Sequence, residues 1–174
     1  MKIILTFILF CVPFFKVIAQ DESQQKFVYE KVLTYENTSK EDLYKYSKRW
    51  VSSLFPNSNA ALRTDDPASG EIIGMGLTEI IENPNALYGP RMSVEFTFMI
   101  NVKDNKSRIR FYDLTQVTPM GLRQSVSSID LEKQNAKERT KVKWKKFVSL
   151  IDAEFISLTD YFTSEIAKSI KDDF

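Results

Sequence analysis

Apolar and polar residues alternate with a period of two along the middle of the chain. The alternation runs from Met92 to Lys103 and returns between Ser107 and Leu114. A period of two is typical of β-strands that bury one face. The polar residues 104–107 separate the two segments, so the pattern predicts an antiparallel hairpin. The first strand has an apolar face formed by Val94, Phe96, Phe98, Ile100 and Val102.

A two-residue turn at positions 105–106 sets the predicted register of this hairpin. It places Val102 opposite Ile109. It also places Ile100 opposite Phe111, so that apolar cross-strand pairs share one face. The other face then carries a mostly polar set, namely Thr97, Met99, Asn101, Arg108, Arg110 and Tyr112.

Three further segments have the composition of strands. They are residues 27–35, 60–65 and 71–81. A turn signal at 66–70 separates the last two of these segments. Residues 83–90 are predicted to form a loop. Residues 115–128, which contain Pro119 and Gly121, are predicted to be irregular or to form a sheet edge.

Two segments have a helical period instead. The first begins with an N-cap signal at residues 37–39, is followed by Glu41 and Asp42, and ends near Phe55-Pro56. Its apolar positions are Leu43, Tyr46, Trp50, Val51 and Leu54. The second runs from about Ala136 to the C-terminus. Its apolar stripe consists of Trp144, Phe147, Ile151, Phe155, Leu158, Phe162 and Ile166.

The predicted order of elements is therefore strand, helix, four strands, helix (β-α-β-β-β-β-α). Short turns between the strands indicate a mainly antiparallel sheet in an α+β domain. Each helix has one apolar stripe, so we expect both helices to cover one sheet face and to leave the other face open.

Several stretches together carry a family resemblance: Val28-Tyr29-Glu30-Lys31-Val32, Ser39-Lys40-Glu41-Asp42-Leu43-Tyr44 with Trp50, Gly70-Glu71-Ile72-Ile73-Gly74-Met75-Gly76, and the hairpin 96–104 with 108–113. On these residues the chain resembles exported bacterial domains of unknown function that have a fold like that of the TATA-binding protein (TBP). The resemblance covers roughly residues 27–114. It implies a shape, and it supplies no activity or functional residue, because a shared fold does not specify function.

The first residues predict export from the cytoplasm. Lys2 precedes a mostly apolar stretch at 3–15, and Val17-Ile18-Ala19 fits a signal-peptidase site. We therefore divide the chain into a signal peptide at 1–19, a flexible leader at 20–26 and a single α+β domain at 27–174. The expected location is the periplasm or the exterior.

Two other interpretations of this segment are weaker. A membrane-spanning helix needs about 20 apolar residues, and Pro13 and Lys16 interrupt the stretch. A lipoprotein needs a small residue before its cysteine, whereas Phe10 precedes Cys11, the only cysteine of the chain.

The residue types exclude several chemistries. The chain has no histidine, and its single cysteine is predicted to leave with the signal peptide. Ser-His-Asp and Cys-His arrangements and imidazole metal sites are therefore excluded. We expect no enzyme activity, no cofactor and no metal. Gly74-Met75-Gly76 lacks the third glycine of a dinucleotide-binding loop. A bulge or a close helix approach is the better interpretation.

A carboxylate-based hydrolase is an alternative that the residue types leave open. Asp65 and Asp66 form the most concentrated acidic pair, and Asp113 is a third candidate. Adjacent strand residues point to opposite faces, however, and Asp66-Pro67 is typical of a turn.

The balance of charge limits the partners. The 24 basic and 23 acidic residues give a net charge of +1, which does not favour nucleic acid. The one local excess of positive charge lies at 133–146. It suggests a weak contact with an anionic surface through Lys141, Lys143, Lys145 and Lys146.

The favoured function is a non-catalytic binding or interaction module that uses the open sheet face. Its predicted ligand-binding residues are Thr97, Asn101, Arg108, Arg110 and Tyr112. Arginine and tyrosine on rigid strands suit a carboxylate, a peptide or a partner protein of the cell envelope. The main alternative is a helix-grip carrier, in which the long helix encloses a small apolar molecule or lipid.

Overall fold

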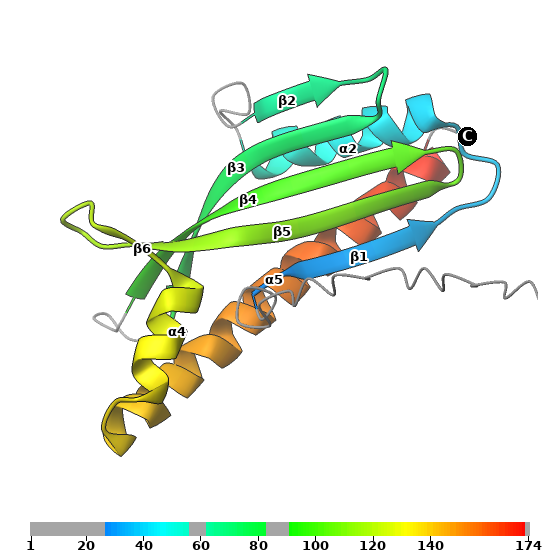
Figure 1. Ribbon diagram of the computed structural model, residues 1–174. Coiled ribbons are helices and arrows are strands. Elements are labelled where there is room, and N and C mark those ends of the chain that lie inside the picture. Colours follow the sequence, from blue (N-terminus) through cyan, green and yellow to red (C-terminus); the bar gives the residue numbers. More distant parts are fainter. Residues whose placement is uncertain (1–26, 56–61, 83–90, 173–174) are drawn as a thin grey trace, which may run out of the picture.

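The computed structural model describes residues 27–55, 62–82 and 91–172. One antiparallel sheet with helices against it forms the described domain (Figure 1). The elements are β1 (Tyr29–Thr34), α2 (Lys40–Leu54), β2 (Leu62–Asp66), β3 (Glu71–Ile81), β4 (Arg91–Lys103), β5 (Lys106–Val117), β6 (Arg123–Ser125), α4 (Val126–Gln134) and α5 (Glu138–Asp172). The predicted signal peptide, the leader and the loop at 83–90 lie outside the described residues.

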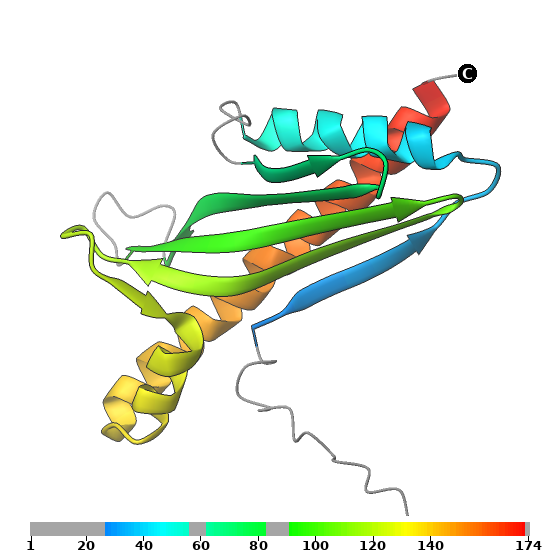
Figure 2. The same ribbon diagram turned by 45° about the horizontal axis from the view of Figure 1, so that its top comes forward.

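The sheet has the strand order β1-β5-β4-β3-β2, and β6 pairs with β5. Each of these pairings is antiparallel. Helices α2 and α5 lie on the same side of the sheet (Figures 1 and 2). The predicted α+β class, the mainly antiparallel sheet and the shared helix face are therefore confirmed. Within the described residues, no helix combines the length and the apolar character needed to cross a membrane.

Aromatic rings fill the space between the sheet and these two helices. The largest buried rings are those of Trp50, Phe96, Phe98, Phe111, Phe155 and Phe162. The centroid of the Trp50 ring lies 5.2 Å from that of Phe162 and 6.3 Å from that of Phe98. Contacts at these distances are those of a packed core. The observed interior therefore gives no support to a helix-grip cavity between these rings.

The β4–β5 hairpin has the predicted faces but not the predicted register. Val102 pairs with Ser107, where Ile109 was expected. Ile100 pairs with Ile109, where Phe111 was expected. From Thr97 to Lys103 every partner is displaced by two residues, and the register shifts between Glu95 and Thr97. A displacement by an even number leaves each side chain on its predicted face, so the apolar side still points at the helices.

The turn lies one residue earlier than predicted because hydrogen bonds from the β1–α2 loop fix its position. Asn105 has a φ of 61°, in the left-handed region. Its side-chain oxygen accepts a hydrogen bond from Thr38 N at 3.0 Å, and its backbone N–H donates to Thr38 O at 2.9 Å. Tyr35 N donates to Asn105 O, and Lys40 N donates to Asp104 Oδ1, each at 2.9 Å. The β1–α2 loop thereby fixes the turn at residues 104–105.

The segment at 115–128, predicted to be irregular or to form a sheet edge, is more regular than expected. Strand β5 continues to Val117, β6 follows, and α4 begins at Val126, so β6 and α4 are additions to the predicted order. All three residues of β6 are exposed, and therefore no alternation marks the strand. Only Val126, Ile129 and Asp130 of α4 are buried, which leaves a weak helical pattern.

Local contacts explain where α2 begins and why β3 has a glycine at position 76. Ser39 is the N-cap of α2, and its hydroxyl accepts a hydrogen bond from Asp42 N at 3.1 Å. At Gly76, a Cβ atom would lie 2.4 Å from the Phe96 ring and 2.9 Å from the ring of Phe55, the C-cap of α2. A bulge or a close helix approach was expected here, and the structure instead places the ring of the cross-strand partner Phe96 over this glycine, with the C-cap ring of α2 beside it.

Candidate ligand-binding site

The predicted site residues lie on the sheet face away from α2 and α5. Asn101 pairs with Arg108 across β4 and β5, and Thr97 pairs with Tyr112. Arg110 lies between these two pairs, opposite Met99. The structure therefore brings all five predicted residues to one face, but it gives them different surroundings.

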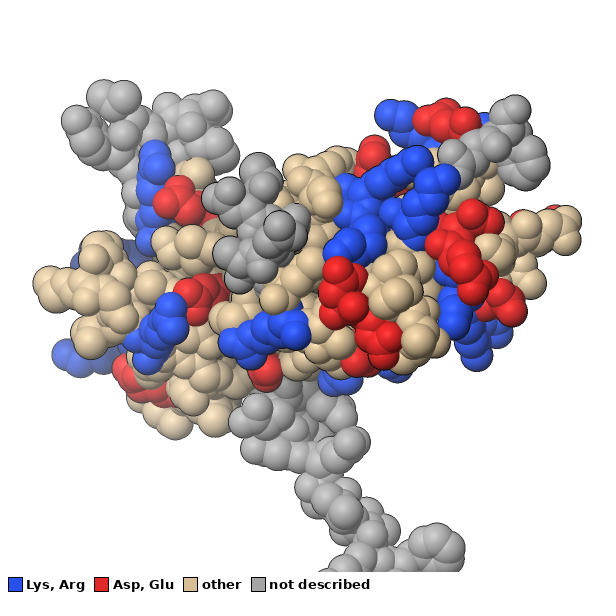
Figure 3. All heavy atoms as spheres, turned by 90° about the horizontal axis from the view of Figure 1, so that it is seen from above, with Lys and Arg blue, Asp and Glu red and all other residues tan. Residues whose placement is uncertain are grey.

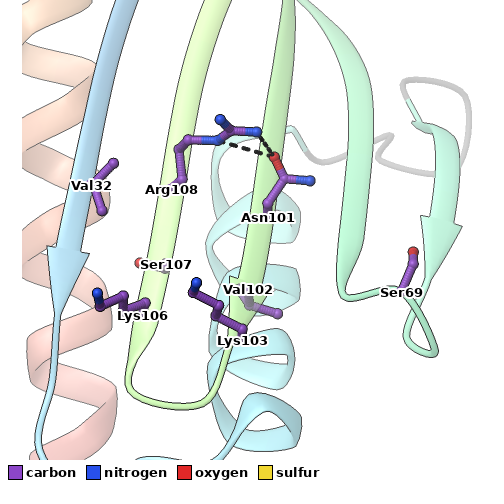
Figure 4. Close-up of a pocket in the computed structure, with 8 residues that line it drawn as sticks. All are labelled: Val32, Ser69, Asn101, Val102, Lys103, Lys106, Ser107 and Arg108. Atoms are coloured by element: carbon purple, nitrogen blue, oxygen red, sulfur yellow. Dashed lines mark hydrogen bonds between the residues drawn. The ribbon is translucent and has the colours of Figure 1, made fainter.

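A short chain of hydrogen bonds fixes Arg108. Its Nε and Nη2 atoms donate to Asn101 Oδ1 at 3.3 and 2.7 Å (Figure 4). Asn101 Nδ2 in turn donates to Glu71 Oε2 at 3.0 Å. The chain spans β5, β4 and β3, so the guanidinium group is held by the sheet itself. Its other N–H groups form no hydrogen bond with any residue that the structure describes and are available to a ligand.

Arg110 contacts two neighbours, although its buried Nε forms no hydrogen bond with a described residue. Its Nε lies 3.8 Å from Glu30 Oε2, and its guanidinium carbon lies 5.3 Å from the centroid of the Tyr112 ring. The nearby carboxylate offsets the charge of Arg110. Burial, followed by the charge of Asp113, raises the pKa of the Tyr112 hydroxyl above its ordinary value. Tyr112 therefore stays protonated at neutral pH and can donate a hydrogen bond.

Thr97 is on the open face but is not accessible. It is 8% exposed, and its cross-strand partners are the larger residues Met75 and Tyr112. A threonine between two long side chains is shielded by them. We therefore do not expect Thr97 to contact a ligand, and its place in the predicted patch needs this correction.

A groove of about 480 Å³ opens beside the β4–β5 turn. Figure 4 shows its lining residues: Val32, Ser69, Asn101, Val102, Lys103, Lys106, Ser107 and Arg108. Asn101 and Arg108 are predicted site residues, whereas Arg110 and Tyr112 lie outside this lining. The groove therefore overlaps one end of the predicted patch and also includes residues near the turn that were not predicted.

Two lysines give the groove its charge. Lys103 and Lys106 face each other across the hairpin. Neither forms an ion pair or a hydrogen bond with another residue that the structure describes. Together with Arg108 they contribute three positive groups, and no carboxylate belongs to the lining. The arrangement suits a negatively charged ligand.

Sequence reasoning missed Lys103 and Lys106 as site residues. The signal was present, because alternation along the strand places Lys103 on the same face as Asn101, two residues earlier. The exact position of the turn was needed to place Lys106 opposite it. Ser69 comes from the β2–β3 turn, and no pattern in the sequence links it to the hairpin.

The acidic pair of the hydrolase alternative is divided between two environments. Asp65 accepts hydrogen bonds from Tyr44 and from Lys48 Nζ, the latter at 2.5 Å. These bonds, that of Lys48 first, hold the pKa of Asp65 below its ordinary value. Asp66 Oδ1 accepts from Ala68 N at 2.9 Å, which confirms the turn interpretation. No group of three metal-ligating side chains occurs in the described parts of the chain.

Charges of both signs are spread over the face seen in Figure 3, in keeping with the net charge of +1. The basic stretch at 133–146 is one local exception. It lies at the α4–α5 end of the molecule, and one of its predicted contact residues, Lys146, is paired with Glu82 at 2.8 Å.

Residues 29–116, half of the chain, match the family model described as a domain of unknown function (DUF4468) with TBP-like fold. The chain belongs to this family. The resemblance inferred from the sequence is thereby confirmed. The DUF4468 match ends within β5, so β6, α4 and α5 lie beyond it.

Two crystal structures have the same fold. One is a DUF4468 family protein from Bacteroides ovatus, with a TM-score of 0.58, 21% identity, and coverage of 78% of this chain and 85% of that chain. The other is a TBP-like protein from Parabacteroides distasonis, with a TM-score of 0.56, 14% identity, and coverage of 78% and 92%. No curated protein matches the chain. These similarities show the TBP-like fold, and the DUF4468 family carries no assigned function.

Proposed function

We propose that this DUF4468 domain is a non-catalytic binding module that recognises a carboxylate-bearing peptide or protein at the groove beside the β4–β5 turn. The observation that carries the proposal is the charge of the groove. Three cationic residues line it, and no carboxylate does. Two of the three, Lys103 and Lys106, have no ionic partner in the described chain.

The shape of the groove suits a side chain or a chain terminus. A volume of about 480 Å³ is within the usual range of ligand sites, which is roughly 300–1,000 Å³. Arg108 is held in place by Asn101, and an immobilised guanidinium binds a planar carboxylate with two parallel hydrogen bonds. Val32 and Val102 offer apolar contact to the carbon atoms beside the charge.

The partner that we propose belongs to the cell envelope. The signal peptide expected at 1–19 would deliver the domain to the periplasm or beyond, where the partners are exported proteins and peptides. Nucleic acid is a poor candidate, because the net charge is +1 and a duplex needs an extended field of positive charge.

A binding assay with matched variants tests the proposal. A fluorescein-labelled hexapeptide of glutamate is titrated with the full chain, and a hexapeptide of glutamine serves as the neutral probe. Fluorescence anisotropy should show binding of the glutamate peptide only. Arg108→Gln should weaken this binding by about tenfold or more, because a bidentate, charge-assisted contact is lost.

Arg91→Gln is the matched control. Arg91 lies at the opposite end of β4 and pairs with Glu79 at 3.5 Å, so the variant makes the same change of charge away from the groove. It should leave the affinity within about twofold of the wild type. Equal losses in the two variants would mean that general charge, and not the groove, attracts the peptide.

A further inference from the structure

The end of the molecule opposite the groove has a different surface. Helix α4 and the first turns of α5 project past the sheet there, and the β5–β6 turn at 118–122 extends from the same end (Figures 1 and 2). We call the basic residues of this projection the basic tip: Lys133, Lys137, Arg139, Lys141, Lys143 and Lys145.

Most of the charge of the basic tip is unpaired. Lys133 lies 2.9 Å from Glu132, whereas the other five residues of the tip form no ion pair with any residue that the structure describes. Lys141 and Lys145 are four residues apart on α5, a spacing at which like charges repel each other. Lys141 also lies in the first turn of α5, at the positive end of the helix dipole. A negative partner would relieve both effects.

A second groove, of about 320 Å³, lies between α4 and α5. Lys133, Lys141 and Lys145 line it, together with Trp144 and Asp130. The carboxylate is already engaged, because Trp144 Nε1 donates to Asp130 Oδ1 at 2.7 Å. Its other oxygen accepts from Gln134 at 2.9 Å. Lys141 and Lys145 are therefore the unpaired cations left for a ligand the size of a phosphate, and with Lys133 they outnumber the one carboxylate of the lining.

Exposed apolar side chains accompany this charge. Met120 is 90% and Leu122 is 68% exposed at the β5–β6 turn. The turn is closed by a hydrogen bond from Thr118 N to Leu122 O at 2.9 Å, so these side chains are presented on an ordered loop. On the helices, Leu131 and Val142 are also exposed beside the lysines. Apolar groups next to unpaired cations are typical of proteins that rest on a lipid interface.

We propose that this end of the molecule docks on a membrane surface that contains anionic lipids. The basic tip binds the headgroup phosphates, with one phosphate in the α4–α5 groove, and Met120 and Leu122 enter the interface. The unpaired positive charge of the basic tip is complementary to the negative charge of such a surface. The surface lies beyond the family match at 29–116, and docking there leaves the groove at the β4–β5 turn free to bind. The two proposals are therefore independent.

The test places an environment-sensitive fluorophore at the turn. In the Cys11→Ser background, Met120→Cys is labelled, and Ile156→Cys, an exposed apolar position in the middle of α5, is the matched control. Vesicles of phosphatidylglycerol and phosphatidylcholine should shift the emission of the label at 120 to shorter wavelength, and added salt should reverse the shift. The label at 156 should not respond, which separates docking of this end from any contact made by residues 1–19.

Two charge variants complete the test. Lys141→Gln with Lys145→Gln should weaken the response by about tenfold or more. Lys168→Gln with Lys171→Gln, on the same helix at its other end, should leave it unchanged. The proposal is overturned if the label at 120 stays silent on anionic vesicles, or if it responds equally to pure phosphatidylcholine. It is also overturned if both variants behave alike, or if inorganic phosphate alone reproduces the response.

Discussion

A single amide oxygen of Asn101 accepts two hydrogen bonds from Arg108, at 2.7 and 3.3 Å. The two residues face each other across β4 and β5, so the sheet fixes both ends of the contact. The guanidinium group is thus oriented before any ligand arrives, which reduces the entropy lost on binding. This arrangement makes one end of an otherwise mixed sheet face suitable for an anion.

The first prediction concerns this pre-organisation. Asn101→Ala should weaken binding of the glutamate peptide by roughly 2- to 12-fold, which corresponds to about 0.5–1.5 kcal/mol for one side chain that must be immobilised. The positive charge remains, so the loss should be smaller than that of Arg108→Gln. Anisotropy titrations measure both. An effect of Asn101→Ala as large as that of Arg108→Gln would show that Asn101 does more than orient its partner.

The second prediction concerns the turn of the hairpin. Asn105→Gly should lower the free energy of unfolding by about 0.5–1.5 kcal/mol, because the hydrogen bond from Thr38 N is lost. Asn105→Ala should cost roughly 1–2 kcal/mol more, since alanine is strained at a φ of 61°. Urea unfolding gives both values. The order of stability should be wild type, glycine, alanine, and a more stable alanine variant would contradict the observed turn.

The third prediction concerns the close approach at Gly76. Gly76→Ala should destabilise the domain by about 1–3 kcal/mol, because the new Cβ would lie 2.4 Å from the Phe96 ring. Phe96→Leu removes the ring atoms that clash. The double variant should therefore lose less stability than the sum of the two single losses, as measured by thermal unfolding. Additive losses would mean that the ring does not lie across this glycine.

The fourth prediction concerns pH. Hydrogen bonds from Lys48 and Tyr44 lower the pKa of Asp65 in the folded state, so the ionised form is stabilised by folding. This contribution is present above the ordinary carboxyl pKa of about 3.9 and is lost as pH falls through the lowered value. Asp65→Asn should therefore cost a constant amount above about pH 5 and progressively less below about pH 4.

The cost at neutral pH should be small, because the Asp65 side chain is 45% exposed and water screens the pair. We expect at most about 1 kcal/mol from urea unfolding at a series of pH values. Lys48→Met, made in the Asp65→Asn background, is the control. It should add no further pH-dependent loss, and a further loss that varies with pH would assign the effect to another carboxylate.

The sequence predicted which face of the sheet each strand residue occupies better than it predicted the cross-strand partner of that residue. Alternation alone placed Asn101, Arg108 and Arg110 on the open side, since a side chain's face depends only on its position in the strand. The partners depend on the turn, and the contacts that fix Asn105 come from a loop nearly 70 residues earlier. No local pattern reports such a contact.

The same limit applies to the site and to the additional elements. The burial of Thr97 depends on Met75, which lies on another strand. The groove depends on Ser69 in a distant turn. Helix α4 is joined to α5 by the buried Trp144–Asp130 hydrogen bond, a tertiary contact that compensates for its weak apolar pattern. Periodicity detects elements that bury a regular stripe, and it misses those held by individual contacts.

The most direct measurement is an NMR titration of the isotope-labelled protein with the glutamate hexapeptide. We predict that backbone shift changes centre on Asn101, Lys103, Lys106 and Arg108, and that Arg108→Gln abolishes them at the same peptide concentration. Changes centred on the basic tip, or shifts that persist in the Arg108→Gln variant, would contradict the proposal that the groove beside the β4–β5 turn is the binding site.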